Sequence, residues 1–144
     1  MAEFVCLDAS VYLKLYLPEP GSMAAERLLD GVLDHGQRLI GPAFLPAEVL
    51  SVVRRCVHQG VMTPGQAEVV LGSFLSLPIE SVDGREVYER AWRIAADLDL
   101  PVLYDAVYLA VAALRGALFW TADQALQTRA QELPYIQLLP STEG

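Results

Sequence analysis

Four acidic side chains stand out in the sequence because each adjoins a run of apolar residues. Asp8 follows one such run, Asp123 follows another, and Asp105 lies near the start of a long apolar helix. Glu48 is the carboxylate of an otherwise apolar segment that also has the pattern of a helix. Because burying a lone carboxylate is costly, an acid in such a place normally has a partner, caps a helix or binds a metal ion.

Each of these acids, taken singly, has a structural explanation. Asp8 and Asp123 precede expected helices, where an aspartate side chain can cap the first N–H groups. Glu48 and Asp105 fall in the first turns of their helices, where the helix dipole favours a negative charge. The sequence leaves these explanations open, and they weaken only when the four positions are considered together.

Together, the four acids predict a site for a hard divalent cation. Ligands of a parallel α/β sheet bind at the C-terminal ends of its strands, and Asp8 and Asp123 both follow expected strands. Carboxylates gathered at that edge repel one another, so the cluster needs a cation. Oxygen ligands without histidine or cysteine select Mg²⁺ or Mn²⁺. Such an ion activates water and stabilises charge on a phosphate, which predicts hydrolysis of a phosphodiester.

Short apolar runs and amphipathic segments alternate along the chain. The apolar runs are expected to be strands, over residues 4–7, 38–41, 79–82, 117–121 and 135–139. The expected helices cover residues 10–17, 22–33, 43–58, 64–76, 84–98, 103–115 and 123–131. This alternation predicts one α/β domain, residues 1–144, with a short, mostly parallel sheet of about five strands and helices on both faces.

Local signals mark the boundaries of the expected helices. Ser22 and Asp83 are the expected N-caps of the helices that follow them. Gly116 is expected to end the helix that carries Asp105, since glycine favours the left-handed conformation that closes a helix. The chain then passes directly into the expected strand that precedes Asp123.

The composition argues against several kinds of protein. A net charge of −8 argues against a broad electrostatic footprint for duplex DNA, although an acid cluster with a bound metal is compatible with a nucleic-acid substrate. The two histidines and two cysteines have no zinc-site spacing. No apolar run is long enough for a membrane span, and Glu3 stands where a signal peptide is basic. We therefore expect a cytoplasmic protein.

The acids and their neighbours resemble a known family. The matching segments are Leu7-Asp8-Ala9-Ser10, Ala47-Glu48-Val49-Leu50 with Arg54-Arg55, Tyr104-Asp105-Ala106-Val107-Tyr108-Leu109-Ala110 and Thr121-Ala122-Asp123. In order and spacing they resemble a PIN domain. In length and layout the chain is most similar to the VapC-type toxins of bacterial and archaeal toxin–antitoxin pairs, and the resemblance runs from Phe4 to about Leu138.

The resemblance implies the fold, the activity and the partners. It implies a PIN-like α/β domain and an endoribonuclease that uses Mg²⁺ or Mn²⁺ to cleave single-stranded RNA, as the toxin of a toxin–antitoxin pair. The partners it implies are an RNA substrate, single-stranded or structured, a second copy of the chain in a homodimer, and a small antitoxin protein whose tail occupies the groove. By the same resemblance, the metal-binding and catalytic acids are Asp8, Glu48, Asp105 and Asp123, and the supporting hydroxyl groups are those of Ser10 and Thr121.

Other interpretations remain for some of these residues and for the whole chain. Arg54 and Arg55 could contact RNA phosphate or an acidic antitoxin, or could only complement the dipole at the end of their helix. A haloacid-dehalogenase-like phosphatase needs an aspartate where Ser10 stands, and a response-regulator receiver needs a lysine after its last strand, whereas the one lysine is Lys14. The alternatives that remain are a PIN-like binding or interaction module with weak catalysis and an RNA-maturation nuclease.

Overall fold

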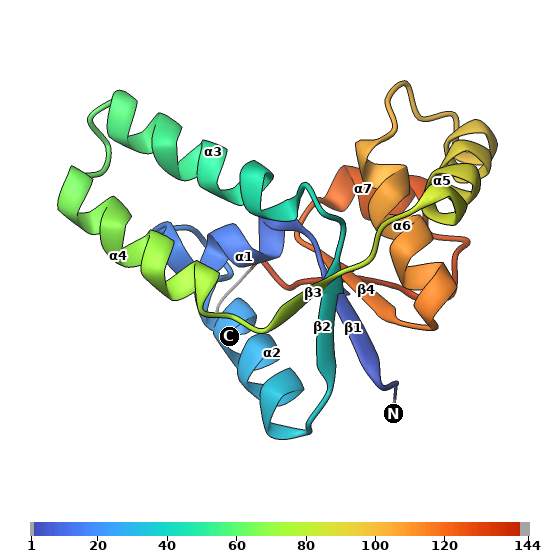
Figure 1. Ribbon diagram of the computed structural model, residues 1–144, viewed down its shortest axis with the longest axis horizontal. Coiled ribbons are helices and arrows are strands. Elements are labelled where there is room, and N and C mark those ends of the chain that lie inside the picture. The colour runs from blue at the N-terminus through green and yellow to red at the C-terminus, as the bar shows by residue number, and fades with distance from the viewer. Residues whose placement is uncertain (1, 142–144) are drawn as a thin grey trace.

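A computed structural model describes residues 2–141 of the chain, and within them helices and strands alternate as predicted (Figure 1). The strands are β1 (Phe4–Leu7), β2 (Arg38–Gly41), β3 (Ile79–Ser81), β4 (Leu118–Thr121) and β5 (Ile136–Leu138). The helices are α1 (Ala9–Tyr16), α2 (Ser22–Asp34), α3 (Leu45–His58), α4 (Pro64–Leu75), α5 (Arg85–Leu98), α6 (Tyr104–Arg115) and α7 (Gln124–Arg129).

The five strands of the described chain form one sheet in the order β3-β2-β1-β4-β5, and every neighbouring pair is parallel. β1 lies at the centre of the sheet, and Leu7 at its end is paired with Trp120 of β4. In a parallel sheet all C-terminal ends lie along the same edge. The residues that follow β1 and β4 are therefore neighbours, although more than one hundred residues separate them in the sequence.

Helices cover both faces of this sheet, as the sequence predicts. α1 and α2 pack on one side, and α6 packs on the other with α5 behind it (Figure 1). Strand residues on both faces are apolar because both faces are covered, so Val5, Cys6 and Leu7 of β1 are all buried. None of the helices within residues 2–141 is long and apolar enough to span a membrane.

α3 and α4 form a helical hairpin that extends outward from the sheet (Figure 1). α3 packs against α1 and α4. It begins only a few residues after β2, so its first turn, which contains Glu48, lies at the C-terminal edge of the sheet. The rest of α3 leads away from this edge and forms one wall of a surface hollow.

Two of the expected helix caps are wrong, and one helix end is confirmed. α2 begins at Ser22 itself after Gly21, and the Ser22 hydroxyl donates to carbonyls of the preceding turn. α5 begins after Gly84, whose φ is 119°, and no side chain caps it, so Asp83 lies one residue too early. In both places a glycine with positive φ sets the path of the chain into the helix. Gly116, with φ 62°, ends α6 as expected.

Candidate active site

The candidate site lies at the C-terminal edge of the sheet, where β1 and β4 end side by side. Asp8 directly follows β1, and its backbone N–H donates to the carbonyl of Trp120 in β4 at 3.1 Å. Thr121 is the last residue of β4, and Asp123 follows two residues later. The parallel pairing of β1 with β4 therefore brings the first and last predicted acids to one place.

Asp8 is buried, with 7% of its surface exposed, and both of its carboxylate oxygens accept hydrogen bonds. The Ser10 hydroxyl and the Val11 N–H, the latter at 3.3 Å, donate to Oδ1, and the Thr121 hydroxyl donates to Oδ2 at 2.6 Å. The bond from Val11 makes Asp8 the N-cap of α1. Asp8 can therefore cap α1 and also belong to the candidate site.

Burial raises the pKa of Asp8 to about 6, from an ordinary value of 3.8. The hydrogen bonds from Ser10, Thr121 and Val11 act in the opposite direction, because they favour the charged carboxylate, but burial outweighs them. The negative charge of Asp105 raises the pKa further. The hydrogen bonds to Asp8 therefore do not offset the cost of burying its negative charge.

Ser10 and Thr121 join the end of β4 to the start of α1. The Ser10 hydroxyl lies 3.5 Å from that of Thr121 and accepts from the backbone N–H of Ala122 at 2.9 Å. The Thr121 hydroxyl accepts from the N–H of Asp123 at 3.0 Å. These bonds hold the backbone near Asp8 and Asp123 in place. The resemblance implies such a supporting role for both hydroxyl groups. The bonds leave the role of each residue in catalysis as a prediction.

Asp105 and Asp123 face a common cavity of about 250 Å³, which Arg129 of α7 also lines. Asp105 is half-buried in the first turn of α6, while Asp123 is exposed and caps α7 through a hydrogen bond from the N–H of Leu126 at 3.1 Å. Burial raises the pKa of Asp105, and the charges of Asp123 and Glu48 raise it further. The three acids are therefore close enough to interact electrostatically.

Glu48 enters the site from α3 and is held by a residue that the sequence analysis did not assign. The buried Tyr108 of α6 donates its hydroxyl to Glu48 Oε1 at 2.6 Å. Burial and this bond to a carboxylate raise the pKa of Tyr108 well above its usual range. The signal was present in the sequence, because a tyrosine in an alanine- and valine-rich helix needs a partner for its hydroxyl, and Tyr108 lies one turn after Asp105.

The four acids form an electrostatic cluster whose donor atoms suit a hard cation. They come from four different parts of the chain, and the coupling runs from Asp8 to Asp105 and from there to Asp123 and Glu48. Within residues 2–141, no three acidic, histidine or cysteine side chains are arranged to hold a metal ion by themselves. Mg²⁺ in proteins is commonly held by one or two carboxylates and keeps several waters, so this donor set fits such an ion.

Arg54 and Arg55 lie on different sides of α3. Arg55 lines a cavity of about 500 Å³ together with Glu48 and Tyr104. Arg54 lines a separate cavity between α3 and α4, which also contains Glu68. Of these two predicted contacts, the structure therefore brings only Arg55 into the same groove as a candidate acid.

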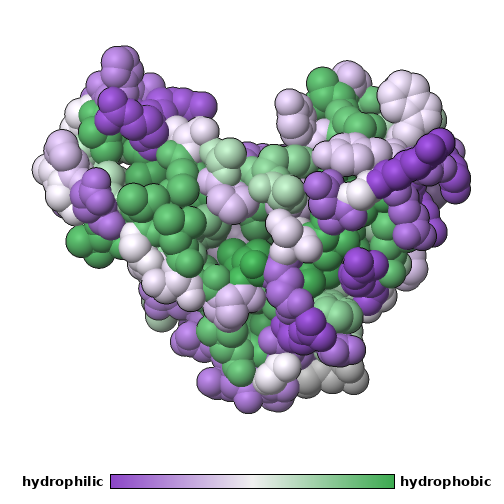
Figure 2. Space-filling model, in the orientation of Figure 1, coloured by the Kyte–Doolittle hydropathy of each residue, from purple (hydrophilic) through white to green (hydrophobic). Residues whose placement is uncertain are grey.

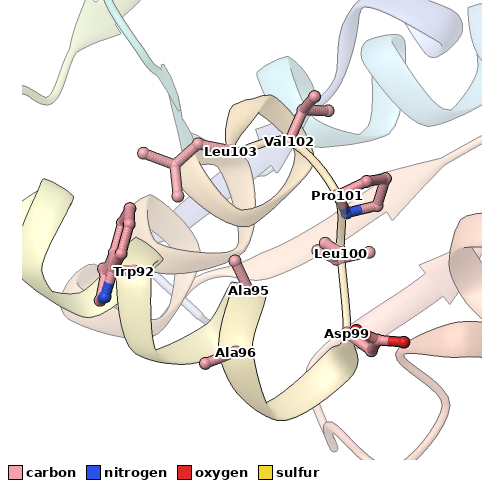
Figure 3. A pocket seen from close by; sticks show the side chains of 8 residues that line it. All are labelled: Trp92, Ala95, Ala96, Asp99, Leu100, Pro101, Val102 and Leu103. Carbon is pink, nitrogen blue, oxygen red and sulfur yellow. The ribbon is translucent and has the colours of Figure 1, made fainter.

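The surface around the site is hollowed. β1 and β2 run upward in Figure 1, and Figure 2 shows a notch at the top of the same view, between the side formed by α3 and α4 and the side formed by α5 and α6. A different pocket of about 310 Å³ lies between the end of α5 and the loop to α6, beside Trp92 and Leu100 (Figure 3). None of the four candidate acids lines that pocket, so it is separate from the acid cluster.

Comparison with known proteins agrees with the fold. A family profile described as PIN domain matches residues 5–132. Ribonuclease VapC12 of Mycobacterium tuberculosis, in strains H37Rv and CDC 1551, is 29% identical over 122 residues, which cover 85% of this chain and 88% of that protein.

Two crystal structures share the fold at lower sequence identity. PAE2754 from Pyrobaculum aerophilum superposes with a TM-score of 0.65 at 23% identity, covering 89% of this chain and 79% of that one. Mycobacterium tuberculosis VapC20, a toxin that cleaves the sarcin–ricin loop, superposes with a TM-score of 0.66 at 17% identity, covering 94% and 99%. Since the family profile spans most of the sequence and the fold agrees, the chain belongs to the PIN domain family.

Proposed function

We propose that this PIN domain is a divalent-metal-dependent endoribonuclease and the toxin of a toxin–antitoxin pair. The observation that carries the proposal is the carboxylate cluster at the C-terminal edge of the sheet, in which Asp8 is buried with a pKa of about 6. A protein rarely keeps such a charge in its interior without a use for it. The similarity to a ribonuclease of the VapC class over most of the chain gives the reaction class.

In this proposal Asp8 and Asp105 hold the metal ion, with Asp123 and Glu48 completing the acidic site. The chemistry that a bound divalent ion supplies is an activated water and stabilisation of the charge on the phosphate. Mg²⁺ and Mn²⁺ are the expected ions because all the donors are carboxylate oxygens. Which acids contact the ion is the part of the proposal that metal-binding measurements on single variants will decide.

The remaining residues of the site position these acids. The hydroxyl groups of Ser10 and Thr121 hold the two oxygens of Asp8. Tyr108 fixes one oxygen of Glu48, and because Glu48 is exposed its other oxygen is open to water. In this proposal Glu48 accepts a proton from the water that attacks the phosphodiester.

The proposed partners are single-stranded RNA, a small antitoxin protein and a second copy of this chain. The antitoxin is proposed to act by occupying the groove beside the acids, which would exclude RNA from the site. The homodimer is supported by an exposed apolar surface on α5 and the loop after it, which contains Tyr88, Trp92 and Val102. Surfaces of this kind commonly mark an interface between proteins.

A ribonuclease assay tests the proposed function. Purified protein is incubated with single-stranded RNA in Mn²⁺, in Mg²⁺ and with a chelator, alongside Asp8→Asn, Asp105→Asn and the surface control Asp97→Asn on α5. We expect cleavage that needs metal, that persists in the control and that both site variants lose while remaining folded. Cleavage that both site variants retain would refute the assignment of the site. A folded protein that cleaves no RNA in either metal would instead favour an interaction module.

A further inference from the structure

A groove of about 500 Å³ runs along α3 from Phe44, past Glu48, to Arg55. Its lining combines an acid of the candidate site, an aromatic ring and a cation. Glu48 and Arg55 come from α3, and Tyr104 comes from the start of α6. The groove therefore shares Glu48 with the acid cluster, so it adjoins the place where the proposed RNA substrate binds.

Tyr104 is an exposed aromatic ring with a fixed support. It is 63% exposed, and it packs edge-to-face against Phe44, with ring centres 5.4 Å apart and an interplanar angle of 87°. Phe44 in turn packs against the buried Tyr108, with ring centres 5.6 Å apart. The exposed ring is thus tied to the core through two aromatic contacts, which limits its motion. A held, exposed ring provides a stacking surface for a nucleic-acid base.

Arg55 lies on the same face of α3 as Glu48, seven residues further along. Two helical turns separate the two side chains, which is roughly 10 Å along the helix axis. Among residues 2–141 the arginines that form ion pairs with acids are Arg38 and Arg85, so no acid of the described chain neutralises Arg55. An exposed guanidinium of this kind matches the geometry of a phosphate group.

We infer that this groove is a nucleotide subsite, in which an unpaired base of the RNA stacks on Tyr104 while Arg55 binds a neighbouring phosphate. The inference rests on the proposed endoribonuclease function and specifies where its substrate binds outside the acids. The occupant is single-stranded, because a base that stacks on Tyr104 has to leave its own helix. Stacking tolerates every base, so the subsite contributes affinity for single strands more than recognition of a sequence.

The chain offers matched controls for both residues. Arg54 is the neighbouring arginine on α3, but it lines the separate cavity between α3 and α4. Tyr104→Phe keeps the aromatic ring and removes only the hydroxyl. The two control variants, Arg54→Ala and Tyr104→Phe, distinguish a nucleotide subsite from a general loss of charge on α3 and from loss of the tyrosine hydroxyl alone.

The test measures the affinity of fluorescein-labelled RNA by anisotropy, in Mn²⁺ and over a range of salt concentrations. The probes are a 12-nucleotide polyadenylate single strand and a 12-base-pair RNA duplex, and every protein carries Asp8→Asn so that the RNA stays intact. We expect Tyr104→Ala to weaken single-strand binding about 5- to 100-fold, with duplex binding unchanged and Tyr104→Phe close to its parent. Arg55→Ala should lower the slope of log affinity against log salt by about 0.7.

Arg54→Ala should leave the single-strand affinity and the salt slope unchanged. If Tyr104→Ala and Arg55→Ala both bind the single strand as tightly as their parent, the subsite is refuted and the groove is left to a protein partner. The subsite is also refuted if the Asp8→Asn parent does not bind the single strand. The cleavage assay with Asp8 intact is scored separately. If RNA is cleaved but the groove variants bind normally, only the subsite fails, whereas absence of cleavage rejects the proposed function.

Discussion

Replacing Asp8 by asparagine should change how the stability of the metal-free protein depends on pH. The folded protein raises the pKa of Asp8 from 3.8 to about 6, chiefly through burial. Between these two values the folded state binds more protons at Asp8 than the unfolded state does. The contribution of Asp8 to stability is therefore fully present below about pH 3.8 and is lost as the pH rises through 6.

The size of this effect follows from the shift of the Asp8 pKa. Each unit corresponds to ~1.4 kcal/mol, so the shift from 3.8 to about 6 costs the folded protein ~3 kcal/mol at pH 8. At pH 5 the folded carboxyl group is mostly protonated, and the same relation leaves a cost of ~1.6 kcal/mol. The wild type should accordingly lose ~1.4 kcal/mol between pH 5 and pH 8 that Asp8→Asn does not lose.

The hydrogen bonds of Asp8 reduce the gain from the substitution but do not reverse it. Asparagine keeps one oxygen, which can still accept from Ser10 and Val11 as Oδ1 does. Its amide group would face the Thr121 hydroxyl, which can turn and accept instead of donating. Allowing about 1–2 kcal/mol for the altered bond, we expect Asp8→Asn to be more stable than the wild type by ~1–2 kcal/mol at pH 8.

Urea unfolding in a chelator, at pH 5 and pH 8, measures this difference. The variant Asp97→Asn on the exposed surface of α5 serves as the control and should follow the pH dependence of the wild type. Reading the result as a difference between two proteins cancels the titration of the acids that do not interact with Asp8. A pH dependence of Asp8→Asn equal to that of the wild type would refute the raised pKa. A large loss of stability at pH 8 would mean that the hydrogen bonds of Asp8 outweigh its burial.

Further predictions concern the residues around Asp8 and one helix end. Tyr108→Phe should lower the rate of RNA cleavage about tenfold, with the fold unchanged by circular dichroism, because Glu48 loses the donor that orients it. Thr121→Val should cost ~2 kcal/mol in urea unfolding, because Asp8 loses a buried donor. Mn²⁺ should raise the melting temperature of the wild type more than that of Asp8→Asn, and an equal rise in both would remove Asp8 from the metal site. Gly116→Ala should lower unfolding stability by ~1 kcal/mol through its φ of 62° alone, since no other group lies within 4 Å of the added methyl.

Much of the fold follows from local patterns in the sequence. The apolar runs mark the strands to within one or two residues, because strands covered on both faces must be apolar throughout. The helices follow from their periodic apolar stripes. The caps at Ser22 and Asp83 were wrong because a glycine with positive φ, at Gly21 and Gly84, sets how the chain enters each helix, and a side chain's capping preference does not report that path.

The candidate site was predictable only as a set of acids on the expected elements. The strand-end rule for parallel sheets joined the four acids into one expected site, but the sequence does not state that β1 and β4 are neighbours. Arg54 and Arg55 are adjacent in the chain and so look equivalent, whereas the helix turns them into different cavities. A contact between residues that are far apart in the chain depends on how whole elements pack.

The sequence by itself determined the alternation of helices and strands, the oxygen-only character of the acids and the end of α6 at Gly116. These are local properties, set by residue type and spacing. Only the tertiary structure decided that the hydroxyl groups of Ser10 and Thr121 donate to Asp8 and that Tyr108 of α6 donates to Glu48 of α3. It also decided that Tyr104 is exposed in the same groove as Arg55. The physical reason is that burial, hydrogen bonding and the coupling between charges are set by distances in space, which the order of the residues does not specify.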